Sequence, residues 1–217
     1  MTRQGWRYGL FALLCVPGLA LAVEVGLVTA LSGTVALQGS APGQSRALQA
    51  FSKLHEGDRL RLEEAVRLQL VFFQSGEEQV WQGPGDLRVG AGGAEALSAG
   101  LQAQVRQLPR VLVKQLAKTP APDGQVKAGM VRLRSMPAGG TLESVEKHYA
   151  QLRQQAAAQD RNPELYLLAS YFELQEYTKV QGLLQKMGKA APADQEVKLL
   201  QALYGRAINN AKNAASP

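Results

Sequence analysis

The chain has 217 residues, an apolar share of 46%, a formal net charge of +6 and a single cysteine. These values are typical of a folded protein of one or two domains and exclude a wholly disordered chain. They also exclude a disulfide-stapled scaffold, so stability must come from apolar cores.

The first 22 residues have the pattern of a secretory signal peptide. Arg3 and Arg7 precede the apolar run Gly9–Pro17, which is shorter than the roughly 20 residues that a membrane-spanning helix needs. The small residues of Ala20-Leu21-Ala22 predict cleavage between Ala22 and Val23. We therefore expect export to the periplasm, with the signal peptide removed and no membrane-spanning segment.

Cys15 leaves a lipoprotein interpretation open, although Leu14 precedes it where a lipidation site needs a small residue. Cleavage after Ala22 would remove Cys15, so we expect the exported body to fold without a disulfide.

Residues 23–107 predict an all-β domain, a sandwich or a barrel. Short segments rich in Val, Leu and Phe alternate with turn residues, and Leu68, Leu70 and Phe72 share one face by a period of two. The expected strands are Val25–Leu31, Thr34–Gln38, Arg46–Ala50, Arg59–Leu62, Val66–Phe73, Gln79–Gln82 and Leu87–Gly90. A further strand ending near Gln107 and a helix over Ala94–Gln107 both stay open.

The order of these segments resembles the FecR-like domain, a β-rich module of exported bacterial proteins. The resemblance is carried by Gly26–Val35, by Leu54–Leu60 with its Gly57-Asp58 turn, by Val66–Gly76 and by Leu87–Val89. It implies a β-rich fold and, since several members are regulators, a sensory role.

Residues 108–140 predict a connector between two bodies. Prolines recur, Thr119–Gly124 reads as semi-rigid, and Pro109 can open a short helix that continues to Lys118. An isolated strand is expected at Met130–Met136. Between Arg106 and Arg134 there are seven basic residues and one acidic residue, so this stretch is either a solvated face or a contact for anionic lipids or wall polymers.

Residues 141–217 have helical periodicity. Thr141 is expected to cap a helix that continues to about Ala158, and Asn162-Pro163-Glu164 to start another. Helices are expected at about 164–175, 178–189 and 193–210.

Residues Arg161 to Asp194 resemble one tetratricopeptide repeat in length and in the placement of Leu167, Tyr171, Tyr177 and Pro192. The resemblance implies a partner-binding concave face. A plain helical bundle is the alternative. Tyr171 and Tyr177 are expected in the helix core rather than in a peptide-docking patch. The candidate partner-binding residues are Asn162, Leu165, Ala169, Phe172 and Glu173.

Catalytic or metal-binding patterns are scarce, since the chain has two histidines and one cysteine. His55 lies near Ser52, Glu56 and Asp58, but neighbours along one loop rarely converge on a substrate, so we expect a surface histidine beside a turn. Glu77-Glu78 is expected at a strand end or turn, with its side chains on opposite faces. We expect neither cofactor nor metal.

The sequence thus favours an α+β chain with segregated parts, acting as a non-enzymatic periplasmic binding or scaffold protein. The expected partner is an envelope protein or peptide, a cell-wall polymer or an anionic membrane surface, and nucleic acid is not expected. The alternative is a sensory protein that reports a ligand to a membrane signalling partner. An enzyme, such as a hydrolase, is the least favoured interpretation.

Overall fold

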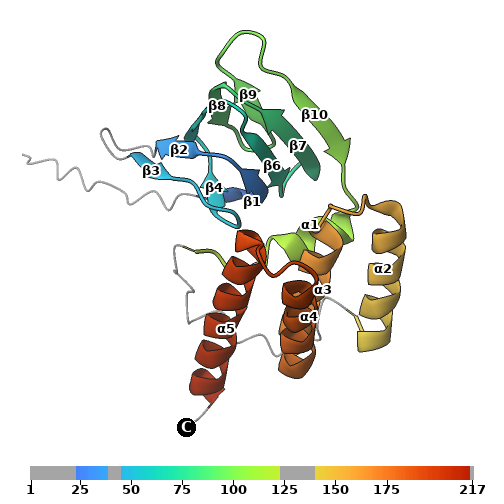
Figure 1. Ribbon diagram of the computed structural model, residues 1–217. Helices are drawn as coiled ribbons and strands as arrows, with labels where there is room; N and C mark the ends of the chain where they lie inside the picture. The colour runs from blue at the N-terminus through green and yellow to red at the C-terminus, as the bar shows by residue number, and fades with distance from the viewer. Residues whose placement is uncertain (1–22, 39–44, 123–139, 216–217) are drawn as a thin grey trace, which may run out of the picture.

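The structure, a computed structural model, describes residues 23–38, 45–122 and 140–215. Within these ranges ten strands are followed by five helices, which confirms the expected α+β arrangement with a β-rich N-terminal part and a helical C-terminal part (Figure 1). The expected signal peptide and the strand expected at Met130–Met136 lie outside the described residues. No helix in the described ranges is long and apolar enough to cross a membrane.

The strands form two five-stranded antiparallel sheets, named A and B here. Sheet A has the order β10-β7-β6-β1-β4, and sheet B has the order β3-β2-β5-β8-β9. The strand bounds are β1 (Glu24–Ser32), β2 (Val35–Gln38), β3 (Ser45–Ala47), β4 (Lys53–His55), β5 (Arg59–Leu62), β6 (Arg67–Phe72), β7 (Glu77–Gln82), β8 (Gly85–Val89), β9 (Ala94–Ala96) and β10 (Ala103–Gln107).

The two sheets pack on each other as a sandwich around a shared apolar core. Leu68, Leu70 and Phe72 of β6 enter it from sheet A, and all three are 0% exposed. Leu60 and Leu87 enter it from sheet B. The period-two pattern of β6 therefore predicts its buried face correctly.

The strand boundaries follow the sequence closely in most places. β5 matches its expected range residue for residue, whereas β4 and β9 were not expected. The helical alternative for residues 94–107 is wrong, because this segment forms β9 and β10 instead. The backbone N–H of Ala94 donates to the side chain of Gln79 at 3.0 Å, and that of Leu97 donates to the carbonyl of Asp86 at 2.8 Å, so sheet contacts hold residues 94–97 extended.

The helices are α1 (Arg110–Leu116), α2 (Leu142–Gln155), α3 (Asn162–Glu173), α4 (Tyr177–Ala190) and α5 (Gln195–Ala215). α2, α3, α4 and α5 pack in that order, each on the next. Thr141 caps α2 as expected, since its hydroxyl oxygen accepts from the N–H of Ser144 at 3.3 Å. Asn162 is the first residue of α3 rather than its cap.

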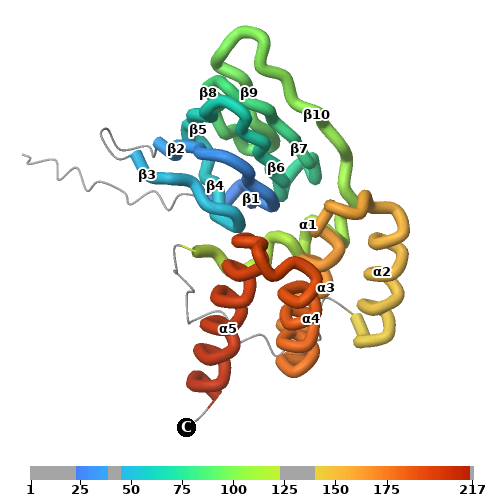
Figure 2. The backbone as a smooth tube through the Cα atoms, in the orientation of Figure 1, coloured from blue at the N-terminus to red at the C-terminus, as the bar shows by residue number. Residues whose placement is uncertain are grey.

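A second apolar core lies between sheet A and the helices, and α1 is at its centre. α1 packs against α3, and Leu112, Val113 and Leu116 are buried in this core together with Leu27 and Val71 of sheet A. In Figures 1 and 2 α1 lies directly beneath the sheets, between them and the longer helices. Sheet A is therefore covered on both faces, which accounts for the unbroken buried run Val25–Thr29 in β1.

Residues 108–119 of the expected connector contain the expected short helix, which is α1, and this segment is packed into the junction core. Within α1, the spacing of Leu112 and Leu116 places two apolar side chains on one face of the helix, and both are buried; Leu108, just before the helix, is buried as well. The connector contributes to the core over this part of its length. Residues 123–139 lie outside the described residues.

Candidate functional site at the junction of sheet A and the helices

Glu78 lies at the centre of the junction between sheet A and the helices. It is the second residue of β7 and faces Val71 of β6 on one side and Arg106 of β10 on the other. Its side chain is only 5% exposed. Glu77 is half-buried, as expected for neighbouring residues that point to opposite faces of a strand.

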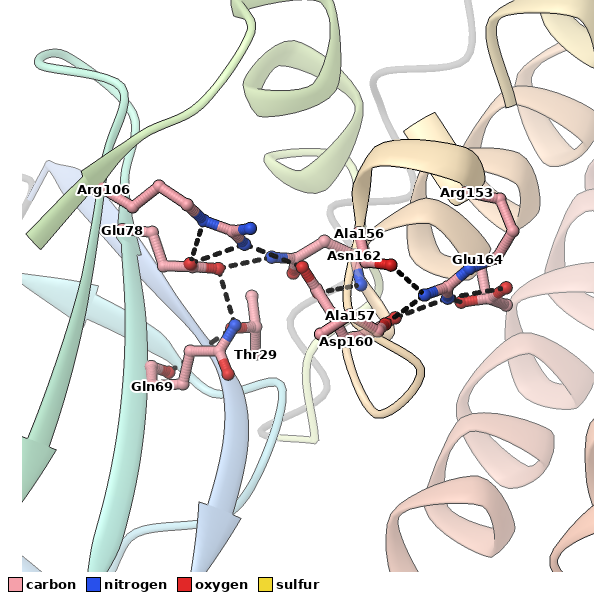
Figure 3. A network of polar contacts seen from close by, with 10 residues as sticks. All are labelled: Thr29, Gln69, Glu78, Arg106, Arg153, Ala156, Ala157, Asp160, Asn162 and Glu164. Carbon is pink, nitrogen blue, oxygen red and sulfur yellow. Dashed lines mark hydrogen bonds and ion pairs between the residues drawn. The ribbon is translucent and has the colours of Figure 1, made fainter. Parts of the chain in front are cut away.

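Three side chains from three elements converge on the Glu78 carboxylate (Figure 3). Its Oε1 accepts hydrogen bonds from Nε2 of Gln69 and from Nδ2 of Asn162, both at 2.6 Å. Its Oε2 accepts from Nε of Arg106 at 2.8 Å. We call this group of four residues the Glu78 clamp.

The clamp ties α3 to sheet A, since Asn162 belongs to α3 and the other three residues belong to β6, β7 and β10. A buried carboxylate is costly unless it is paired and hydrogen-bonded. Removing one partner of such a pair typically costs about 3–5 kcal/mol. The geometry therefore holds the helices and the sheet at one relative position.

Arg106 also reaches the loop between α2 and α3. Its Nη2 forms an ion pair with Oδ2 of Asp160 at 2.7 Å. Burial alone would lower the pKa of the Arg106 guanidinium, but the hydrogen bond to Asp160 and the charges of Glu78 and Asp160 outweigh burial and raise it. Arg106 therefore stays cationic between its two carboxylates.

The same loop is ordered by Arg153 of α2. Its guanidinium donates to the carbonyl of Asp160 at 2.7 Å and to that of Ala156 at 3.2 Å, and it also donates to the carbonyl of Ala157. It pairs with Glu164 of α3 at 3.0 Å. Figure 3 shows these contacts beside the clamp. They fix the position of Asp160, and so the second carboxylate that Arg106 meets.

A second polar contact joins the N-terminus of α5 to β1. The side chain of Glu196 accepts from the backbone N–H of Leu31 at 2.8 Å. Arg161 pairs with Glu196 at 2.6 Å and with Asp194, whose carboxylate accepts from the N–H groups of Glu196 and Val197. Burial raises the pKa of Glu196 despite the charge of Arg161.

Glu173 connects the helices to α1. Its Oε2 accepts from Nζ of Lys118 at 2.6 Å and from Nε2 of Gln115 at 3.2 Å. On the other side, Nζ of Lys53 in β4 donates to the carbonyl of Ala117 at 2.7 Å. The segment from α1 to Lys118 is thus bonded both to sheet A and to α3.

Three of the five candidate partner-binding residues are buried within the chain. Asn162 is 1%, Leu165 0% and Ala169 2% exposed. Phe172 is half-buried, with its ring 5.6 Å from that of Tyr177 and 6.0 Å from that of Tyr204. Glu173 is half-buried and engaged by Gln115 and Lys118. Asn162 is bound by sheet A, Glu173 by the α1 segment, and Phe172 packs on α4 and α5. The face of α3 expected to receive a partner is therefore covered within the chain.

Tyr171 and Tyr177 lie in or against an apolar core, as the sequence analysis expects. Tyr171 is 7% exposed and packs in the junction core, and Tyr177 is half-buried against it. The phenol of Tyr171 donates to Glu146 at 3.0 Å. Burial, with the negative charge of Glu146, raises the pKa of Tyr171 to about 12.

The loop around His55 has a structural role. The N–H of His55 donates to the Asp58 carboxylate at 2.9 Å, and Gly57 has a φ of +88°, so this is the expected Gly-Asp turn. The His55 side chain is 32% exposed, with its Nδ1 3.8 Å from Asp58. Among the described residues, no group of three or more His, Cys, Asp and Glu side chains could hold a metal ion.

Four basic residues of the stretch from Arg106 to Arg134 lie in the described ranges. Arg106 and Lys118 are neutralised by ion pairs, whereas Arg110 and Lys114 are exposed on α1. The positive surface available to an anionic partner in this part is thus smaller than the residue count suggested.

Sequence reasoning misses the clamp, because the strand expected at Gln79–Gln82 leaves Glu78 at a turn. A carboxylate one residue inside a strand, next to an alternating apolar pattern, is the signal that could have located it. Its partner Asn162 lies 84 residues away, and no local pattern connects the two.

Comparison with known proteins found no matching family model, no matching curated protein and no matching solved structure.

Proposed function

We propose that this chain is a non-enzymatic binding or scaffold protein of the bacterial envelope, exported to the periplasm by its N-terminal segment. The FecR-like and tetratricopeptide-like resemblances of its sequence and the signal-peptide pattern of residues 1–22 support this proposal. The sandwich acts as the FecR-like module, and the helices act as a tetratricopeptide-like support.

The observation that carries the proposal is the Glu78 clamp. The buried polar side chains at the junction bind one another, joining sheet A to α3 over a common apolar core. A body whose two parts keep a fixed relative position can present distant surfaces to partners at a set geometry. Rigid elements give more precise binding sites than loops do.

The surfaces left for partners differ from those suggested by the sequence. The face of α3 that was expected to receive a partner is covered within the chain. Among the described residues, the outer faces of α2 and α4 are exposed, with His148 and Gln151 on α2 and Gln185 on α4. We therefore place partner binding on these outer faces and on the sandwich surface.

Site-specific photocrosslinking in the bacterial envelope tests the proposal. A photoreactive residue is placed at Gln151 or Gln185, with Phe172 as the internal comparison because it packs against Tyr177 and Tyr204. We expect the two exposed positions to give a discrete crosslinked envelope protein and Phe172 to give none.

Two negative results together would contradict the proposed function. If no exposed position yields a crosslinked protein, and the purified protein does not sediment with peptidoglycan or with anionic vesicles, the scaffold function is wrong. Crosslinking at Phe172 alone would restore the partner-binding role of the α3 face and contradict the placement on the outer faces.

A further inference from the structure

Strand β10 is the longest of the four strands that end the two sheets. β3, β4 and β9 have three residues each, whereas β10 has five. Residues 104–107 are all exposed, and Val105 is 57% exposed. In Figures 1 and 2 β10 runs along the rim of the sandwich toward α1.

Three residues of β10 point their backbone N–H and C=O groups away from the sheet. The N–H of Leu108 donates to the carbonyl of Gly76 at the β7 side at 3.0 Å, and hydrogen-bonding direction alternates along an antiparallel strand. Gln104 and Arg106 therefore point their backbone groups at β7. Ala103, Val105 and Gln107 point theirs away from it, where the described residues contain no further strand.

Edges of this kind are usually protected in soluble proteins by lysine, proline, a bulge or a covering segment. β10 contains neither lysine nor proline, and its pairing with β7 runs through five residues without a register shift. Its one charged side chain, Arg106, turns to Glu78 and Asp160. β4 differs, because its Lys53 is bonded to the carbonyl of Ala117 beside α1. The β10 edge is thus suited to accept a strand.

We propose that the partner of this edge is β10 of a second copy of the chain, added antiparallel about a two-fold axis at Val105. In this register Val105 faces Val105 of the second copy, Gln104 faces Arg106, and Ala103 faces Gln107. An antiparallel pair of identical strands is self-complementary, and no like charges face each other across it. An acidic peptide fits less well, because Arg106 is already neutralised within the chain.

The pairing is expected to be reversible. A ladder of five residues buries well below the roughly 1,600 Å² of a standard protein interface, so the dimer should form at micromolar concentrations or above. It creates a continuous sheet of ten strands from two copies of sheet A. The inference goes beyond the proposed function, since it holds or fails whatever envelope partner the protein binds.

Disulfide trapping tests the register directly. The variant carries Val105→Cys in a Cys15→Ser background, so that the new thiol is the only cysteine. Directly opposed residues of a hydrogen-bonded antiparallel pair have Cα atoms about 5.5 Å apart, which lies within the range of a disulfide. The matched control is Leu97→Cys, since Leu97 is 51% exposed.

Under mild oxidation we expect Val105→Cys to form disulfide dimers about tenfold faster than Leu97→Cys. Equal rates would indicate random collision and overturn the proposal.

Sedimentation equilibrium gives the second readout. Val105→Pro removes an outward N–H without touching the ladder to β7, whereas Val105→Thr keeps the N–H and the β-branched shape. We expect the wild type and Val105→Thr to dimerise with rising concentration and Val105→Pro to stay monomeric. A wild type that stays monomeric up to several hundred micromolar contradicts the proposal. A second result would also contradict it. If the wild type never self-associates and Val105→Pro loses an envelope partner, the edge binds a strand from another protein.

Discussion

The core between the two sheets is apolar almost throughout, whereas the core between sheet A and the helices includes a buried carboxylate. In the sandwich, leucines and valines from facing strands meet by simple alternation. At the junction, Leu27, Leu116 and Leu165 pack next to Glu78, Asn162 and Arg106. We infer that apolar contacts bring sheet A and the helices together, while the clamp sets their relative orientation.

The largest expected effect concerns α1. Leu116→Ala should lower the free energy of unfolding by about 2–5 kcal/mol, as much as Leu68→Ala in the sandwich, because both side chains are 0% exposed. Urea unfolding measures both. Lys114→Ala on the same helix is the control, expected within about 0.5 kcal/mol because Lys114 is exposed. A Leu116→Ala cost as small as that of Lys114→Ala would show that α1 contributes little to the junction core.

The second effect concerns the clamp. Glu78→Ala leaves Arg106 and Asn162 without their common acceptor, so we expect a loss of about 2–4 kcal/mol, discounted because the Arg106 side chain is 47% exposed. Glu77→Ala, at the neighbouring position on the opposite face, should cost less than about 1 kcal/mol. Chemical denaturation of both variants gives the comparison. Equal costs would show that the clamp adds nothing specific to the junction.

The third effect is pH-dependent and concerns α5. Burial would raise the pKa of Asp194, but hydrogen bonds from Arg161 and from the N–H groups of Val197 and Glu196 outweigh burial and lower it below its ordinary 3.8. A carboxyl whose pKa is lower in the folded state stabilises the fold above its unfolded pKa. That stability is lost as the pH falls through the folded value.

Asp194→Ala should therefore cost about 1–2 kcal/mol at pH 7 and much less at pH 2, as measured by urea midpoints across this range. Glu196→Gln is the contrasting variant. The pKa of Glu196 is raised by burial, so the wild type loses the contribution of Glu196 as the pH rises through the folded value. A constant cost of Asp194→Ala at all pH values would contradict the assignment.

The smallest effect concerns Tyr204, whose hydroxyl is buried without a hydrogen-bond partner among the described residues. Tyr204→Phe removes a polar atom that gains little in the folded state, so the free energy of unfolding should change by less than about 1 kcal/mol in either direction. Thermal unfolding suffices to measure it. A loss of about 2 kcal/mol or more would reveal a bond made by this hydroxyl.

Sequence reasoning located the sandwich and the helices well, because their signals are local. The period of two in β6, the turn at Gly57-Asp58 and the cap at Thr141 each depend on residues close in the chain. β4 and β9 were missed because three residues are too few to show a period, and their extended form depends on pairing with β1 and β8.

The candidate site was predicted less well, because its contacts join distant segments. The sequence placed Asn162 on a face for partners, whereas its side chain donates to Glu78, 84 residues earlier. Nothing close to Leu165 or Ala169 in the sequence indicates that these two side chains are buried within the chain. The short helix that became α1 is expected from Pro109, but the surrounding prolines place it in a connector and not in a core. Local patterns thus predict elements, and long-range burial decides which of their faces remain free.

The most direct test of the coupling between the sandwich and the helices is whether they unfold together. Trp81 is 4% exposed in the sandwich, and with Trp6 replaced by Phe it is the only tryptophan. Its fluorescence reports the sandwich, while circular dichroism at the helix band reports α2 to α5. We expect coincident urea transitions for the two signals, because the junction core and the Glu78 clamp couple the two parts. Two separate transitions, with the helices melting before Trp81 becomes exposed, would contradict it.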